Sequence, residues 1–67
     1  METTKCSKRI RAFRKLKGLT QQQLAEMTGL SVTIIGELER GNRSAHHHML
    51  QVIAEALEIQ EKELLGS

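Results

Sequence analysis

Residues 21–40 read QQQLAEMTGLSVTIIGELER, and this stretch decides the fold. Thr20, directly before it, is suited to cap a helix, because its hydroxyl can accept a backbone N–H of the first turn. Gln23 follows three residues later and completes a T-x-x-Q capping box. Gly29 stands where the backbone can turn left-handed without a clashing Cβ. We therefore predict a helix over residues 20–28 that ends at a glycine turn.

A second helix is predicted over residues 31–39, with Ser31 as its N-cap. Leu30 is expected to return to the core, and Ile35 and Leu38 to lie on the inner face of the helix, three residues apart. Two short helices joined by a tight glycine turn are typical of a helix-turn-helix, which places its second helix in the DNA major groove.

The run LTQQQLAEMTGLSVTIIGELERG, residues 19–41, resembles the Cro and phage-repressor type of helix-turn-helix proteins, often called the Xre family. The resemblance extends from about Ile10 to Leu65 and therefore covers most of the chain. It implies a compact, five-helix, lambda-repressor-like domain in a bacterial or phage-type DNA-binding protein.

The composition is that of a small helical domain. The chain has 67 residues, one Phe and no Pro, Trp or Tyr, and good helix formers dominate it. β-Branched residues do not alternate with polar ones as they would in a half-buried strand. We predict an all-α fold in which residues 1–67 form a single helix-turn-helix DNA-binding domain, with the motif at about residues 21–40.

Cys6 is the one cysteine, so no disulfide can form within the chain, which favours a reducing compartment. The first eight residues, METTKCSK, lack the apolar stretch of a signal peptide. No apolar run approaches the roughly 18 residues of a membrane span. We expect a cytoplasmic, nucleoid-associated protein without membrane contact.

The charge is distributed unevenly along the chain. Residues 1–43 hold nine Lys or Arg against four Glu, a net charge of +5, and residues 44–67 hold one Lys against four Glu, a net charge of −3. A basic half suggests an anionic partner. The alternative is that residues 5–17 are the solvated face of a helix, but beside a helix-turn-helix, nucleic acid is the better explanation.

A first helix is predicted over residues 7–17, after a frayed segment of residues 1–6, and Gly18 should end it. One narrow stripe of this region should face inward, namely Cys6, Ile10, Phe13 and Lys17.

A fourth helix is predicted over residues 46–57 and a short fifth helix over residues 60–65. The core positions expected on the fourth helix match the helical i, i+3, i+4, i+7 template, namely Leu50, Ile53, Ala54 and Leu57. Relatives usually carry Pro-Ser before this helix, where the chain has Ala45 and His46, so Ser44 is an alternative cap. If His47 is buried, it should be neutral and hydrogen-bonded.

The outer face of the helix over residues 31–39 is predicted to read bases. Val32 can pack on a thymine methyl, Thr33 can donate or accept, and Glu37 can accept from a cytosine amine. Gly36 either allows close approach of the backbone to DNA or is merely tolerated, since a glycine in a helix costs about 1 kcal/mol relative to alanine.

Contacts to the DNA backbone are predicted around both ends of this helix, from Gln22, Ser31, Arg40, Asn42 and Arg43. Arginines beside the groove can clamp phosphates, the alternative being a solvated loop. The resemblance implies that Gln21, at a positive helix start, contacts the DNA backbone or a neighbouring base, and we assign it to base reading. Relatives often pair the positions of Arg14 and Glu39, so we expect a bidentate, partly buried ion pair there.

A second apolar stripe on the fourth helix exceeds what the core of one chain needs. With the apolar residues of the fifth helix it predicts a two-fold homodimer through Met49, Val52, Ala56, Ile59, Leu64 and Leu65. Such a dimer would require a near-palindromic site, with half-sites about 34 Å apart.

Other classes of function find little support. His46, His47 and His48 are consecutive and point about 100° apart on a helix, so they cannot converge on one metal, and we predict no metal and no cofactor. No nucleophile–base pair or phosphate-binding glycine loop indicates an enzyme. We predict a sequence-specific double-stranded DNA-binding transcriptional regulator, a repressor. The alternative is an antitoxin or anti-regulator that binds another protein through its acidic, Leu-rich residues 55–65.

Overall fold

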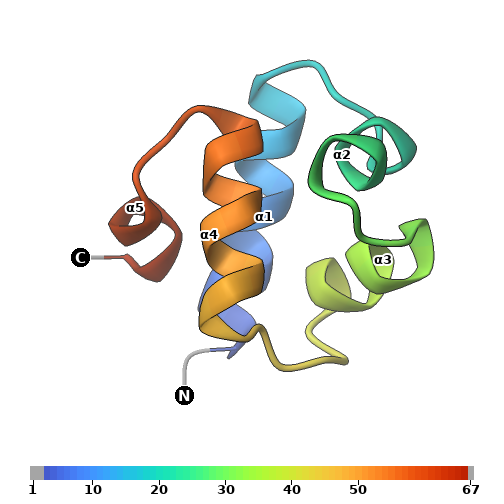
Figure 1. The fold of residues 1–67 in the computed structure, drawn as a ribbon. Coiled ribbons are helices and arrows are strands. Elements are labelled where there is room, and N and C mark those ends of the chain that lie inside the picture. Colours follow the sequence, from blue (N-terminus) through green and yellow to red (C-terminus); the bar gives the residue numbers. More distant parts are fainter. Residues whose placement is uncertain (1–2, 67) are drawn as a thin grey trace.

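The computed structural model describes residues 3–66, with side chains from residue 6 onward. Along the chain, this part of the protein forms the helices α1 (Thr3–Leu16), α2 (Gln21–Thr28), α3 (Val32–Arg40), α4 (His47–Leu57) and α5 (Glu61–Leu65), with no strand among residues 3–66 (Figure 1). The prediction of an all-α, five-helix fold is confirmed.

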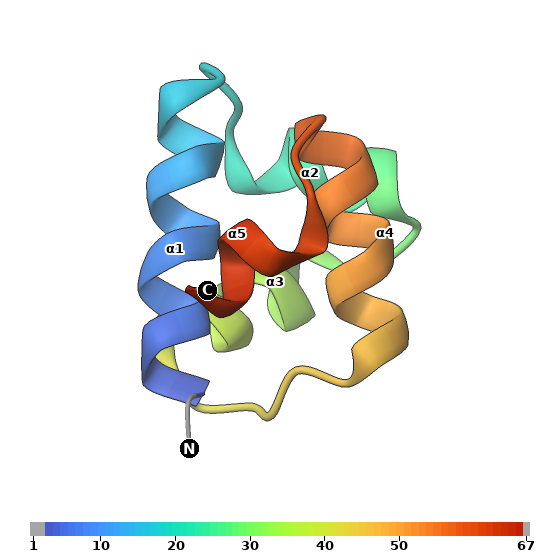
Figure 2. The same ribbon diagram turned by 90° about the vertical axis from the view of Figure 1, so that its left-hand side faces the viewer.

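The long helices α1 and α4 form the middle of the molecule. On one side α5 bridges them (Figure 2), and on the other side α3 packs against α1 while α2 packs against α4 (Figure 1). The helix-turn-helix and α5 therefore occupy opposite sides of the domain.

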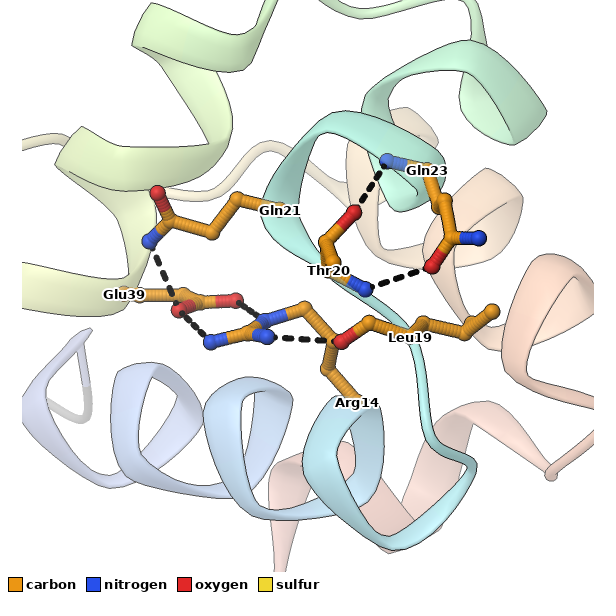
Figure 3. Close-up of polar contacts among 6 residues, drawn as sticks. All are labelled: Arg14, Leu19, Thr20, Gln21, Gln23 and Glu39. Atoms are coloured by element: carbon orange, nitrogen blue, oxygen red, sulfur yellow. Dashed lines mark hydrogen bonds and ion pairs between the residues drawn. The ribbon is translucent and has the colours of Figure 1, made fainter.

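The predicted caps fix the ends of α2 and α3. The Thr20 hydroxyl accepts from the Gln23 backbone N–H at 3.0 Å, and Gln23 Oε1 accepts from the Thr20 N–H at 2.8 Å (Figure 3). Gly29 is left-handed, with φ 79°, and ends α2. The Ser31 hydroxyl accepts from the Ile34 N–H at 3.1 Å and starts α3. Local sequence signals therefore predict both helices to within one residue.

A single core joins the helices. Its fully buried large side chains are Ile10, Leu24, Ile35, Leu38, Ile53, Leu57 and Leu64. Each such side chain contributes about 1.5–3 kcal/mol by leaving water. The predicted core residues of α4, including Leu50 and Ala54, are all buried, and Leu30 packs against this core as expected.

Helix α1 differs from the prediction at both ends. It begins at Thr3, so the expected fraying is wrong for residues 3–6, while residues 1–2 lie outside the described part. The buried Cys6 explains the extra turn, because it continues the inner face of the helix. At the other end Lys17 is exposed and lies beyond α1, and Arg14 takes the inward position that follows Ile10 by four residues.

Helix α4 begins at His47, within one residue of the predicted start. Its N-cap is His46, not Ser44, and His46 makes no side-chain capping bond. His47 is exposed, and its Nδ1 lies 2.8 Å from Glu61 Oε2, which ties the start of α4 to the start of α5. Glu58 ends α4 in a left-handed conformation, with φ 60°.

Candidate nucleic-acid interface

Arg14 and Glu39 form a bidentate ion pair between α1 and α3. Arg14 Nε donates to Glu39 Oε2 at 2.6 Å, and Arg14 Nη2 donates to Oε1 at 3.0 Å (Figure 3). The third guanidinium nitrogen, Nη1, donates to the Leu19 carbonyl at 2.7 Å. One arginine therefore fixes α3 and the turn before α2 against α1, which sets the position of the whole helix-turn-helix.

Gln21 shares this carboxylate. Its Nε2 donates to Glu39 Oε1 at 3.0 Å, and its carbonyl oxygen points away from Glu39 (Figure 3). Because a carboxylate accepts but cannot donate, the amide of Gln21 must present its nitrogen to Glu39. The oxygen is left as an acceptor, which suits the amino group of a base and is unsuited to a phosphate.

The outer face of α3 presents Val32 and Thr33, both exposed. Glu37, the third expected base reader, is paired with the loop that follows α3, since Arg43 Nε lies 2.7 Å from Glu37 Oε1. An expected base reader and an expected phosphate contact therefore neutralise each other in the free protein.

Gly36 lies beneath the side chain of Arg40. It is buried in this arrangement, so the predicted close approach of DNA to its backbone would require Arg40 to move. A Cβ built on Gly36 would lie 3.1 Å from Nη1 of Arg40, and its three nearest neighbours all belong to the guanidinium of Arg40. Helical side chains lean toward the N-terminus, so Arg40 covers the position one turn before its own.

The other expected backbone contacts are exposed around α3. Gln22 lies on the first turn of α2, Ser31 caps α3, Arg40 ends it and Asn42 follows in the loop. Exposed polar and cationic side chains therefore lie at both ends of α3, and Val32 and Thr33 are exposed on its first turn.

A hollow of about 220 Å³ opens where α1, α2 and α3 meet, lined by Arg11, Arg14, Gln21, Glu39 and Arg40. Arg11 belongs to the basic segment of residues 5–17, for which the sequence analysis predicted no individual contact, and it shares this hollow with Arg40. The sequence could have indicated this position, because Arg11 precedes Arg14 by three residues and residues three apart lie on the same side of a helix.

The residues predicted for a dimer interface fall into two groups. Met49, Val52, Ala56 and Ile59 are partly buried against the core, and Leu65 is 44% exposed. Leu64 is fully buried inside its own chain, so its assignment to an interface is wrong. With only one of these two adjacent leucines able to face inward, α5 uses Leu64 to anchor itself on the core.

No group of three His, Cys, Asp or Glu suited to a metal occurs in the part of the chain that the structure describes. His46, His47 and His48 are all exposed. Among the described helices, none combines the length and apolar character needed to cross a membrane.

Comparison with known proteins agrees with this geometry. A helix-turn-helix family model matches residues 10–64. YazB, an HTH-type transcriptional regulator of Bacillus subtilis, is 50% identical over 64 residues, 96% of this chain and 93% of that protein. The structure of the restriction-modification controller protein C.AhdI from Aeromonas hydrophila is 37% identical with a TM-score of 0.89, over 92% of this chain and 94% of that chain. The DNA-binding domain of the P22 C2 repressor is 32% identical with a TM-score of 0.88, over 97% and 86%. The chain therefore belongs to the Cro and phage-repressor type of helix-turn-helix proteins, a family of DNA-binding transcriptional regulators.

Proposed function

We propose that the protein represses transcription by binding a near-palindromic double-stranded DNA operator as a homodimer, with α3 in the major groove. The observation that carries this proposal is the exposed outer face of α3, with Val32 and Thr33 on its first turn and the exposed Arg40 and Asn42 at and after its end. Small apolar and hydroxyl groups suit base edges, while the surrounding donors suit phosphates. Residues 1–67 act as one DNA-binding unit on the nucleoid in the cytoplasm, with no cofactor and no catalytic step.

Base reading is assigned to Val32, Thr33, Glu37 and Gln21. Val32 contributes a methyl surface for thymine, and Thr33 a hydroxyl that can donate or accept. The carbonyl oxygen of Gln21 and the carboxylate of Glu37 are acceptors, which favour the amino groups of adenine or cytosine. Contacts from Gln22, Ser31, Arg40, Asn42 and Arg43 fix the position of the protein on the DNA backbone without reading sequence.

The dimer is assigned to the side of the molecule that carries α5, using Leu65 together with Met49, Val52, Ala56 and Ile59. In a two-fold pair joined through these residues, both copies of α3 have to reach the same duplex. Half-sites about 34 Å apart would then match the two copies of α3.

Selection of bound sites from a random duplex library tests the proposal. The wild-type protein should select a near-palindrome, and Val32→Ala should change the preference at one position of each half-site, by about 1–3 kcal/mol of discrimination. Leu16→Ala is the matched control, because Leu16 is an exposed apolar residue on α1, outside the outer face of α3. If Val32→Ala leaves the selected site unchanged, a surface other than α3 reads the DNA.

A salt titration with random duplex DNA distinguishes the proposal from an antitoxin or anti-regulator that acts through residues 55–65. A DNA-binding protein should bind measurably at low salt, and its affinity should fall steeply as the salt concentration rises. Absence of binding at low salt would instead favour a protein partner.

A further inference from the structure

The side chain of Arg40 is the one feature around Gly36 that a larger residue at this position would disturb. Glycine is the least favourable residue in a helix interior apart from proline. Its φ at this position lies outside the left-handed region, so the backbone does not require glycine. The nearest atoms around a Cβ built there all belong to the guanidinium of Arg40, and none belongs to the core.

Arg40, whose guanidinium lies against Gly36, also lines the hollow between α1, α2 and α3. Arg11 lines the same hollow from α1. The carboxylate of Glu39 at this site already accepts three bonds, two from Arg14 and one from Gln21. Its charge is balanced by Arg14, and neither Arg11 nor Arg40 has an acidic partner within residues 6–66. The hollow therefore presents two uncompensated cations.

We propose that Gly36 is a positioning residue for DNA binding, because its missing side chain provides a seat for the Arg40 guanidinium. In that seat Arg40 and Arg11 together bind one phosphodiester group of the DNA backbone at the hollow. A phosphate with two arginine partners gains charge-assisted hydrogen bonds from both. This inference rests on the proposed function and adds to it a residue that makes no DNA contact of its own.

A methyl group at position 36 would approach Nη1 of Arg40 to 3.1 Å, which is too close for an undisturbed contact. The guanidinium is the end of a flexible side chain, so it should move away without strain in the fold. Gly36→Ala should therefore keep or raise the melting temperature, because alanine is the better helix former, and should weaken DNA binding. Opposite changes in stability and affinity separate positioning from a loss of folding.

The experiment is a double-mutant cycle of Gly36→Ala and Arg40→Ala, read as affinity for random duplex DNA across a salt series. Arg40→Ala should weaken binding about tenfold and reduce the salt slope by about one. Gly36→Ala should weaken binding roughly fivefold in the wild-type background and have no further effect once Arg40 is alanine. Arg11→Ala should resemble Arg40→Ala, whereas the matched control Lys15→Ala, an exposed cation on the same helix outside the hollow, should change affinity less than twofold.

Two results would overturn the inference while leaving the proposed function intact. In the first, Gly36→Ala leaves the affinity of the wild-type background unchanged. In the second, it weakens binding equally with and without Arg40, which would mean that the new methyl group meets the DNA directly. Failure of the wild-type protein to bind duplex DNA would instead remove the proposed function and this inference together.

Discussion

At the residue scale, the carboxylate of Glu39 accepts three side-chain hydrogen bonds, two from Arg14 and one from Gln21. Its side chain is only 2% exposed, and that of Arg14 is 10% exposed. A buried charge is tolerated when a partner and further hydrogen bonds replace its water, and removing one partner leaves the other charge buried and unpaired. Removing Arg14 should therefore lower the free energy of unfolding by more than the loss of an exposed charge would.

Arg14→Ala should lower the free energy of unfolding by about 3–5 kcal/mol, a large part of the roughly 5–15 kcal/mol of a typical domain. Thermal and urea unfolding would measure the loss. Lys15→Ala is the control, because the neighbouring Lys15 is exposed and should change stability by about 0.5 kcal/mol or less. Equal effects of the two substitutions would mean that Arg14 behaves as a surface charge.

The Glu37–Arg43 pair should control how strongly the protein binds DNA of any sequence. Both side chains are partly exposed, at 31% and 41%, so the pair contributes little to stability. Glu37→Ala removes a negative charge from the proposed DNA face and releases Arg43 for a phosphate. We expect tighter binding to random duplex DNA and a salt slope steeper by about one, whereas Arg43→Ala should make the slope shallower by about one.

Glu55→Ala is the control for this charge effect, because Glu55 is an exposed carboxylate on α4 and lies outside the helix-turn-helix. Its removal changes the net charge by the same amount without releasing Arg43. If Glu37→Ala and Glu55→Ala alter the salt slope equally, net charge explains the result and the pair has no special role.

At the element scale, the end of α4 contains a residue in an unfavourable conformation. Glu58 is the one non-glycine residue with positive φ among residues 3–66, although its N–H still bonds back to the Ala54 and Glu55 carbonyls as a helix cap requires. A left-handed conformation costs an L-residue with a Cβ roughly 1–2 kcal/mol. Helices α2 and α3 instead end at Gly29 and Gly41, and glycine adopts the left-handed conformation without this cost.

Glu58→Gly should therefore stabilise the protein by about 0.5–1 kcal/mol, measured as a higher urea midpoint at an unchanged slope. The same substitution three residues earlier, Glu55→Gly, places glycine inside α4 and should destabilise the protein by about 1 kcal/mol. Destabilisation by both substitutions would show that the Glu58 side chain contributes more than its backbone conformation costs.

The helix boundaries show how much of the fold can be predicted from the sequence. Thr20, Gly29 and Ser31 act on backbone groups within four residues, so their effect on α2 and α3 is readable from the sequence alone. The start of α1 depends on tertiary packing, because the buried Cys6 extends the helix toward the N-terminus, so the local signals placed this start four residues too late. The end of α4 at Leu57 agrees with the prediction. The seat of Arg40 on Gly36 joins residues one turn apart, but which way a long side chain folds depends on the neighbouring helices, so the sequence could not give it.

At the scale of the whole molecule, charge and topology divide the surface in the same way. The net charge of +5 lies in residues 1–43, which include the helix-turn-helix, and the net charge of −3 lies in residues 44–67, which include α4 and α5. Because α5 and the helix-turn-helix lie on opposite sides of the α1–α4 pair (Figure 1), the basic and the acidic residues are kept on different parts of the surface, and the basic part is the one suited to DNA.

Leu65 provides the sharpest test of the proposed dimer. It is exposed in the single chain, so Leu65→Lys should leave the fold intact, whereas charges at the partly buried Val52 or Ile59 would also disturb the core. The wild-type protein should sediment as a dimer at tens of micromolar, and Leu65→Lys should shift it toward monomer. On a near-palindromic site the variant should then bind with the affinity of a single half-site, because the second recognition helix is no longer linked to the first.

Leu16→Lys is the matched control for this experiment. Leu16 is even more exposed than Leu65, at 76%, and it ends α1 outside the predicted interface. It adds the same charge and removes the same side chain, so any general effect of a new lysine on solubility or DNA attraction should appear in both variants. Only Leu65→Lys should dissociate the dimer. A wild-type protein that sediments as a strict monomer and occupies one half-site would contradict the assembly, while leaving the assignment of α3 to the major groove to be decided by the selected sequence.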